Sequence, residues 1–455
     1  MPTSSRLLCL VALLMGCGMT TGCNCGEPAS ETPPEEPTAE GEPPEVEDAP
    51  EAPETPDDSD YGQELARLSA QVRAHEHSVA TYDNDWGRLE RLAEAYAARA
   101  KLTGNYEDYQ AADRTVARAF EMAPEGTGPF VVGAHLHYTL HRLAQASEAL
   151  DRAEAAVMTT PSIIEMISVI RADIAFHRGE FAAAEAGHRA QDEARPSNAS
   201  AFRVAYDLWQ SGRFNEAEQW LSTAASRVPD SDPRTQAWMN IQKGLIDLDR
   251  GRCADALAHY REAETLFSGW WLVEEHIAEA LACTGELEEA ETLYRDVVER
   301  TNNPELIDAL ADLLEERGEA EEAATFRARA TARFEEQLEQ LPEAAYGHAL
   351  EHFLAHGTPE RSLELAEANY EMRPGAEATI RLTQALLRSG RAEDALARIT
   401  PLLATPFRSA EMHATAAVAY RANGDEENGA SQEALAVAIH PEIMEDVAGF
   451  APSEE

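Results

Sequence analysis

The residues of this chain that are best suited to chemistry are histidines and a glutamate at helical spacing. The segment HALEHFLAHG contains His348, Glu351 and His352, and a second segment, HLHYTLH, contains His137 and His141. Two histidines four positions apart lie on one face of a helix, where both imidazoles can bind the same metal ion. A metal held in this way activates water for hydrolysis, so these segments raise the possibility of an enzyme.

The order His-x-x-Glu-His is similar to that of the inverted zinc peptidases. That family needs an α/β scaffold. Here the motif lies within one of the predicted helical repeats described below, and Gly357 and Pro374 stand at the glycine and proline positions of that repeat. The sequence also lacks a G-x-S-x-G motif, a phosphate-binding P-loop and a dinucleotide-binding fingerprint. We therefore predict no catalytic residue, no bound metal and no cofactor, and we expect that the protein is not an enzyme.

The charge of the chain narrows the class of partner. Among its 455 residues, 83 are acidic and 37 are basic, which gives a formal net charge of -46. Because a phosphate backbone attracts a basic surface, this charge argues against nucleic acid and favours a basic protein partner, or none. Alanine, leucine, glutamate and arginine dominate the composition, which is typical of helical proteins.

A short sequence motif that contains a glycine recurs along the chain, as in SGRFNEAEQWL at residues 211–221. The glycines stand at positions 179, 212, 251, 285, 318, 357, 390 and 424, so that successive spacings are 33, 39, 34, 33, 39, 33 and 34 residues. A period near 34 residues predicts a helical solenoid. In each unit the glycine ends one helix and turns the chain into the next, and a proline often follows seventeen residues later, where it stops the second helix.

These units resemble the tetratricopeptide repeat (TPR). The small residues that this family needs at repeat positions 8 and 20 fall on Ala172, Ala205, Gly244, Ala278, Ala311 and Ala417, and on Ala184, Ala217, Ala256, Ala290, Ala323 and Ala395. Ser362 and Gly429 depart from the pattern. The resemblance implies an all-α fold, a right-handed α-α superhelix of about ten repeats over roughly residues 84–441. The two 39-residue spacings suggest lengthened helices at 218–245 and 321–350.

The resemblance also implies which residues line the concave side of the superhelix. An aromatic and aliphatic floor would contain Met166, Val169, Phe176, Phe202, Tyr206, Trp209 and Trp238, and an acidic wall would contain Glu275, Glu279, Glu305, Asp308, Asp312 and Glu315. Such a groove suits a basic amphipathic segment of a protein partner, since the floor supplies buried area and the acids orient it. The alternative is that the superhelix coils tightly enough to bury the rings, and that the acids are a solvated face.

Two cysteines complete what the TPR resemblance implies. Cys253 follows its glycine at the start of one helix, and Cys283 precedes the next glycine at the end of the following helix. In a TPR stack these two helices run antiparallel in contact, which can bring the Cα atoms within the 4.4–6.8 Å or so that a disulfide needs. We expect a Cys253–Cys283 disulfide; the alternative is a pair of small buried residues in a tight helix contact.

The first residues form a separate unit. Arg6 precedes the apolar run LLCLVALLM, which is too short to span a bilayer and has the length of a signal-peptide core. LMGC, ending at Cys17, resembles the bacterial lipobox, which implies a signal peptide over residues 1–16 and a lipid on Cys17. Cys23 is a weaker candidate for the anchor, and an ordinary cleaved signal is the alternative. Because Gly18 is not an aspartate-type retention signal, we expect the outer membrane, facing the periplasm or the exterior.

An acidic, proline-rich tether over residues 17–60 separates this anchor from the repeats. Residues 26–60 contain fourteen acids and nine prolines and no basic residue, so they cannot pack a core. Without those acids and the one arginine of the signal, residues 61–455 still carry 33 net negative charges. We expect a solenoid over 61–441 and a short acidic tail over 442–455. The predicted function is an exported, lipid-anchored scaffold for a protein partner; the alternative is a structural or assembly component of the envelope that acts through oligomerisation.

Overall fold

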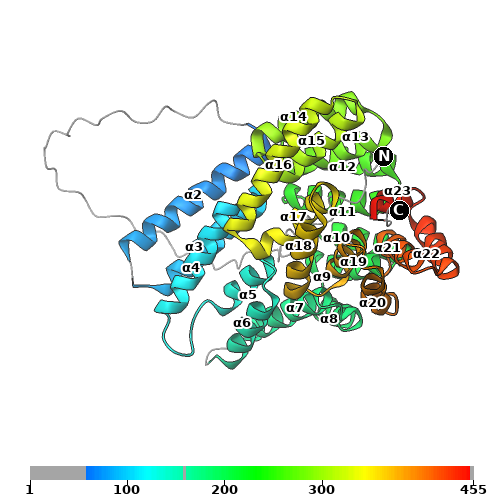
Figure 1. Ribbon diagram of the computed structural model, residues 1–455. Helices are drawn as coiled ribbons and strands as arrows, with labels where there is room; N and C mark the ends of the chain where they lie inside the picture. The colour runs from blue at the N-terminus through cyan, green and yellow to red at the C-terminus, as the bar shows by residue number, and fades with distance from the viewer. Residues whose placement is uncertain (1–57, 83, 157–159, 451–455) are drawn as a thin grey trace, which may run out of the picture.

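The computed structural model describes residues 58–82, 84–156 and 160–450, and within these ranges it contains 22 α-helices, one 3₁₀ helix and no strand (Figure 1). The first half comprises α2 (Asp60–Thr81), α3 (Trp86–Thr103), α4 (Tyr106–Met122), α5 (Phe130–Thr139), α6 (Leu143–Ala155), α7 (Pro161–His177), α8 (Phe181–Ala194), α9 (Asn198–Gln210), α10 (Phe214–Ser226), α11 (Pro233–Leu248) and α12 (Cys253–Leu266). The second half comprises α13 (Trp271–Thr284), α14 (Leu287–Thr301), α15 (Pro304–Glu316), α16 (Ala320–Gln340), α17 (Pro342–His356), α18 (Pro359–Met372), α19 (Ala376–Arg388), α20 (Ala392–Leu403), α21 (Ala410–Ala422), α22 (Glu426–Ile439), α23 (Ile443–Val447) and η1 (Ala448–Phe450). The predicted all-α fold class is confirmed.

Consecutive helices pack as helical hairpins, for example α9 with α10 and α11 with α12. The repeated glycine makes the turn within a hairpin: Gly212 and Gly251 have φ angles of 69° and 68°, a left-handed conformation that glycine adopts without strain. The small residues Ala217 and Ala256 are completely buried, which lets the two helices of a hairpin approach closely. The chain is therefore a TPR-like helical repeat protein.

The two 39-residue spacings have different causes. The second lies in α16, which is lengthened to 21 residues, as the sequence predicts. The first is shared between α11, which has 16 residues against 13 in α9, and residues 227–232, which connect α10 to α11. Pro229 and Pro233 explain this break, since proline lacks the N–H that a continuing helix would need. The prediction of lengthened helices within residues 218–245 therefore holds for α11 and not for α10.

Contacts between segments far apart in the sequence close the superhelix on itself. The Trp271 indole N–H at the start of α13 donates to the carbonyl of Leu102 in α3 at 3.0 Å. Gln110 in α4 donates from its side-chain amide to the carbonyl at the end of α16 at 3.1 Å, where the two helices meet in Figure 1. The backbone N–H of Arg408, before α21, donates to the carbonyl of Gln210, at the end of α9, at 2.8 Å. Later repeats therefore cover the inner side of earlier ones.

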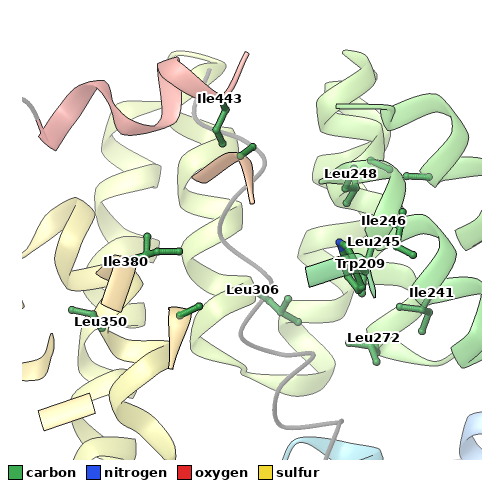
Figure 2. Close-up of a cluster of buried hydrophobic side chains, with 14 of the residues drawn as sticks. Trp209, Ile241, Leu245, Ile246, Leu248, Leu272, Leu306, Leu350, Ile380 and Ile443 are labelled. Atoms are coloured by element: carbon green, nitrogen blue, oxygen red, sulfur yellow. The ribbon is translucent and has the colours of Figure 1, made fainter. Parts of the chain in front are cut away.

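This closure produces one large hydrophobic core, which extends from Leu68 in α2 to Val447 in α23. Figure 2 shows part of it, with Trp209 on α9 and with Leu306 and Ile380 on the later helices α15 and α19. Burial of apolar area is the main favourable contribution to folding, and its strength depends on area and not on direction. The interior of the superhelix is thus used to stabilise the fold.

The disulfide expected from the TPR resemblance is present in the structure. Cys253 at the start of α12 and Cys283 near the end of α13 are joined, and their Cα atoms lie 6.0 Å apart. This separation is within the range of ordinary disulfides, because α12 and α13 lie side by side. The bond connects two consecutive hairpins.

The ends of the chain differ in what the structure describes. Residues 443–450, which the sequence assigns to an acidic tail, form α23 and η1, and Ile443 and Val447 are buried against the repeats. The folded body therefore continues beyond the predicted boundary at residue 441. The predicted signal peptide, Cys17, Cys23 and nearly all of the predicted tether lie outside the described residues. In the part that is described, every helix is either too short or too polar to cross a bilayer.

Candidate functional site

The rings predicted to form the floor of a groove pack against one another. Phe202 and Trp209 on α9 are 7% and 2% exposed, and Phe176 on α7 is 9% exposed. The ring of Phe176 lies 5.0 Å from that of Tyr206, and the ring of Phe202 lies 4.4 Å from that of Trp238. These centroid distances are typical of favourable aromatic pairs, so each ring finds its partner in a neighbouring repeat.

A cavity of about 90 Å³ remains beside these rings. Phe176, Tyr206 and Trp209 form one side of it, and residues of α19, α21 and α23 form the other. A helix with its side chains is about 10–12 Å across, so this volume holds a few water molecules or one small group and excludes an amphipathic segment. The exposed aromatic floor predicted from the sequence is corrected for Phe176, Phe202 and Trp209, which are buried, whereas Tyr206 and Trp238 are partly buried. Closure of the superhelix brings the C-terminal helices over these rings.

The carboxyl group of Asp249, which lines this cavity, is hydrogen-bonded to an aromatic side chain. The indole N–H of Trp209 donates to a carboxylate oxygen of Asp249 at 2.6 Å. Burial raises the pKa of Asp249 to about 7, although the hydrogen bond from Trp209 acts in the opposite direction. The indole thus supplies both apolar area and a hydrogen bond to a buried carboxyl group.

The acids of α15, predicted to form a wall, are paired with the histidines of α17. The pairs are Glu305 with His348, Asp308 with His352 at 3.1 Å, and Asp312 with His356 at 3.5 Å. Residues three or four positions apart share one face of a helix, so two adjacent helices can match such rows in register. Burial lowers the pKa of His348, but the neighbouring Glu305 outweighs it, and the net effect is a raised pKa. We call these three pairs the acid–histidine ladder.

The glutamate of the His-x-x-Glu-His segment has a different partner. Glu351 accepts a hydrogen bond at 2.5 Å from Arg381 of α19, which also contacts Glu411. Burial raises the pKa of Glu351 to about 8, although Arg381 acts to lower it. Each member of the segment therefore has a partner on another helix, and the arrangement is one of pairing between repeats.

The remaining predicted positions are divided between surface and interior. Met166 on α7 is 38% exposed and Glu315 at the end of α15 is exposed, whereas Val169 is buried. Glu275 and Glu279 on α13 are buried, with exposed fractions of 0% and 6%. The predicted acidic wall is therefore mostly an interior layer, because the same closure that covers the rings also covers α13 and α15.

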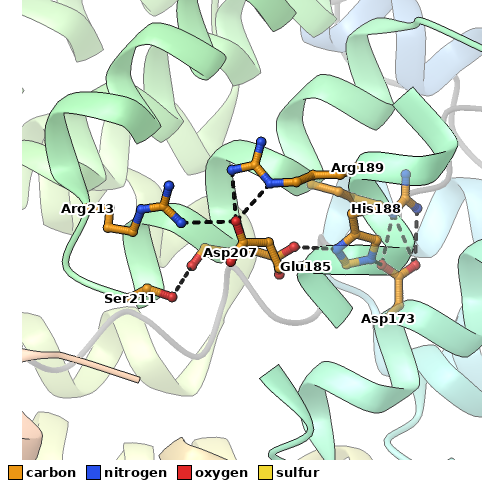
Figure 3. Close-up of polar contacts among 8 residues, drawn as sticks. Asp173, Glu185, His188, Arg189, Asp207, Ser211 and Arg213 are labelled. Carbon is orange, nitrogen blue, oxygen red and sulfur yellow. Dashed lines mark hydrogen bonds and ion pairs between the residues drawn. The ribbon is translucent and has the colours of Figure 1, made fainter. Parts of the chain in front are cut away.

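A charged network between α7, α8 and α9 was not predicted from the sequence (Figure 3). His188 lies between Asp207 and Asp173, with nitrogen–oxygen distances of 2.7 and 3.1 Å, and Arg203 is 2.9 Å from Asp173. Burial lowers the pKa of His188, but its hydrogen bonds to both aspartates outweigh this and raise it to about 9. The network contains Asp173 on α7, His188 on α8, and Arg203 and Asp207 on α9. The signal that could have revealed it is that each of these charged residues falls at a position of a repeat helix that faces a neighbouring helix.

An open cleft lies on the outer surface, between α18, α19 and α20. Its volume is about 450 Å³, and its walls include Tyr370, Leu382 and Leu386 together with the exposed acids Glu371 and Asp394. Arg398 stacks over the ring of Tyr370 at 4.5 Å, and Glu367 and Arg391 complete the rim. Apolar groups below charged ones are the usual composition of a recognition site. No sequence signal pointed to this cleft, because its walls come from three helices of two repeats, α18, α19 and α20.

Comparisons with known proteins concern the fold alone. No protein-family model and no curated protein matches the chain. Among solved structures, the human IFIT1 dimer with m7Gppp-AAAA is 15% identical, with 82% of this chain and 94% of that chain covered and a TM-score of 0.40. A tetratricopeptide repeat protein from Parabacteroides merdae is 17% identical, with 56% and 98% covered and a TM-score of 0.35.

Proposed function

We propose that this protein is an exported, lipid-anchored, non-catalytic scaffold that holds a basic protein partner on its outer surface. The observation that carries the proposal is the contrast between two volumes: about 90 Å³ in the cavity beside the aromatic rings and about 450 Å³ in the outer cleft. A partner segment requires a surface that it can reach, and the outer cleft offers one of adequate size.

The chemistry of the cleft indicates the kind of partner. Leu382, Leu386 and Tyr370 can bury an apolar side chain, and the acids of the rim can pair with lysine or arginine. The net negative charge of residues 61–455 adds a long-range attraction that increases the association rate of a basic partner. A basic amphipathic segment therefore fits the outer cleft better than it fits the interior.

A charge-reversal experiment tests this site. The full-length protein and a Glu371→Lys/Asp394→Lys variant would be used to capture partners from envelope extract, with elution by increasing salt. We expect the variant to lose the salt-sensitive partner, because both changes place positive charge on the rim. Tyr206→Phe, at the buried cavity, is the matched control and should capture as the wild type does. Equal capture by the charge-reversed protein would refute the cleft as the docking site.

The anchor needs its own test, because it rests on the sequence. LMGC ending at Cys17 and the acidic tether that follows support a lipid-attached protein held away from the membrane. Metabolic labelling with a palmitate analogue should mark the wild type and the Cys23→Ser variant, and should not mark Cys17→Ser. A Cys17→Ser protein that still carries the label would move the anchor or end the lipoprotein proposal.

A second candidate function is a structural or assembly role through self-association. It is favoured by Leu435 and Val437, which are 46% and 38% exposed on α22, the last helix of the final hairpin. The net negative charge of the folded part opposes contact between two copies, and salt weakens this repulsion. Sedimentation velocity at low and high salt tests it: a dimer that Leu435→Glu dissociates would support self-association, and a monomer at both salt concentrations would exclude it.

A further inference from the structure

Three potential metal ligands converge within α13. Glu275, His276 and Glu279 each offer one ligand atom, and these atoms all lie within 4.8 Å of one another. The three side chains are 0%, 1% and 6% exposed. Because Glu275 and Glu279 are four residues apart and His276 precedes Glu279 by three, all three can point to one place beside the helix.

Glu275 lacks the partners that a buried carboxylate requires. Its side chain is completely buried, yet within the described part of the chain neither of its oxygens accepts a hydrogen bond. The acids of the acid–histidine ladder each have a separate histidine on another helix, whereas Glu275 and Glu279 share the single imidazole of His276. A buried carboxylate without a donor or cation is strongly unfavourable, so a cation at this place would remove a real cost.

Two separations between the ligand atoms are close to those of tetrahedral coordination. His276 Nδ1 lies 3.3 Å from Glu279 Oε2 and 3.6 Å from Glu275 Oε2. Around an ion with bond lengths of 2.0–2.1 Å, the edge of a tetrahedron is about 3.3–3.4 Å. We infer that Glu275, His276 and Glu279 supply three ligands to one Zn²⁺ ion in the interior of the superhelix, with water as the fourth ligand.

The donor set selects the class of metal. An imidazole nitrogen disfavours Mg²⁺ and Ca²⁺, which prefer oxygen ligands, and two carboxylates with one imidazole suit Zn²⁺. Two carboxylates and one divalent ion give a neutral site, which is the state that an apolar interior tolerates best.

The surrounding residues hold the imidazole in place. The ring of Tyr260 on α12 stacks on His276 with centroids 5.1 Å apart and an interplanar angle of 18°. Tyr260 reaches this position because Gly244 on α11 has no side chain: a Cβ there would lie 2.2 Å from the tyrosine ring. The histidine pairs that suggest a metal in the sequence lie on other helices, so this site was not predicted. On α13 a single histidine lies between glutamates in a chain rich in glutamate.

Zinc content and cobalt substitution test this site. Full-length protein would be stripped with a chelator, returned to Zn²⁺ or Co²⁺, and assayed for bound metal and for the visible absorption of tetrahedral Co²⁺. We expect one equivalent of metal, a tetrahedral Co²⁺ spectrum that Zn²⁺ abolishes, and a higher melting temperature with metal. Glu275→Gln, which has the same shape without the charge, should weaken Zn²⁺ binding roughly 100-fold or more, since even loss of an outer partner costs 10–100-fold.

His352→Gln is the matched control, because it removes a buried helical histidine of the acid–histidine ladder and leaves α13 intact. It should bind Zn²⁺ as the wild type does. The inference would be overturned if the wild type binds no zinc and the Glu275→Gln variant is at least as stable as the wild type in chelator. That result would show that a proton neutralises Glu275. If Glu275→Gln does not fold, the wild-type Co²⁺ spectrum decides: a spectrum like that of Co²⁺ in water would also overturn it.

Discussion

The concave side of the superhelix is built in two different ways. In its aromatic half, on α7, α9 and α11, rings pack against rings of the next repeat, as Phe202 does against Trp238. In its acidic half, the carboxylates of α15 are paired with histidines of a later helix, as Glu305 is with His348, whereas those of α13 lie beside His276 of the same helix. An apolar group is satisfied by any apolar neighbour, whereas a buried carboxylate needs a particular donor or cation at bonding distance. The aromatic half can therefore pack against any apolar side chain, whereas the acidic half requires particular partners for its carboxylates.

The largest effect is expected in the aromatic half. Trp209→Ala should lower the free energy of unfolding by about 4 kcal/mol, because it opens a cavity in the core and removes the donor to Asp249. Urea denaturation measures this loss. Trp220→Ala, at a partly exposed position on α10, is the control and should cost about 1 kcal/mol. Equal, small effects of both changes would mean that Trp209 faces an open groove.

The disulfide between α12 and α13 joins the two halves. Replacing both Cys253 and Cys283 by serine should lower the free energy of unfolding by about 3–4 kcal/mol, because the crosslink restricts a loop of 30 residues in the unfolded chain. Peptide mapping without reduction should show the crosslink in protein isolated from its native compartment. Reducing agent should destabilise the wild type and leave the double variant unchanged; free thiols in the isolated protein would contradict the prediction.

Specific pairing in the acidic half is tested at the acid–histidine ladder. His348→Ala should lower the free energy of unfolding by about 3 kcal/mol, because it leaves the largely buried Glu305 without its histidine. In the His348→Ala/Glu305→Ala double variant the loss should be clearly less than the sum of the two single losses. A double-mutant cycle by urea denaturation measures this coupling. Additive losses would show that the two residues do not interact.

The smallest effect concerns the charged network of Figure 3 in the aromatic half. The pKa of His188 is about 9 in the folded protein and its ordinary value is 6.5, so the folded state binds more protons between these values. The stabilisation is complete below pH 6.5 and is lost as pH rises through 9. From pH 7 to 9 this loss of the His188 proton should lower the free energy of unfolding by about 2 kcal/mol. His188→Gln should remove this contribution and leave the smaller fall that Glu351, with a pKa of about 8, also produces.

The control for this pH dependence is another buried histidine. Burial lowers the pKa of His177 to about 4, so this residue stays neutral over the whole range. His177→Gln should therefore keep the slope of the wild type. An equal slope in the His188→Gln variant would show that His188 is not protonated between its two aspartates.

Much of the fold could be predicted from the sequence, because its signals are local. Gly212 and Gly251 mark turns, Ala217 and Ala256 mark close helix contacts, and both recur at a fixed period. The exposure of the concave side could not be predicted in this way. It depends on the pitch of the superhelix, which decides whether a contact such as that of Arg408 with Gln210 forms, and no local pattern encodes it.

The pairing of the acidic half shows the same limit. The rows at 305–312 and 348–356 were both visible as helical patterns, but only the fold places α15 beside α17. Glu351 looked like part of a metallopeptidase motif until its partner, Arg381, was known. Spacing within one helix thus predicts which residues share a face, and the tertiary arrangement decides what they face.

Closure of the superhelix is the central claim, and a crosslink tests it most directly. The backbone hydrogen bond of Arg408 to Gln210 brings these two residues to roughly the separation that a disulfide spans. In a Gln210→Cys/Arg408→Cys variant under mild oxidation, the account predicts an intramolecular 210–408 disulfide, identified by mass spectrometry of unreduced peptides, with the wild-type helical content retained. Folded protein in which both new thiols stay free would show an open superhelix with an accessible concave groove, and would contradict the account.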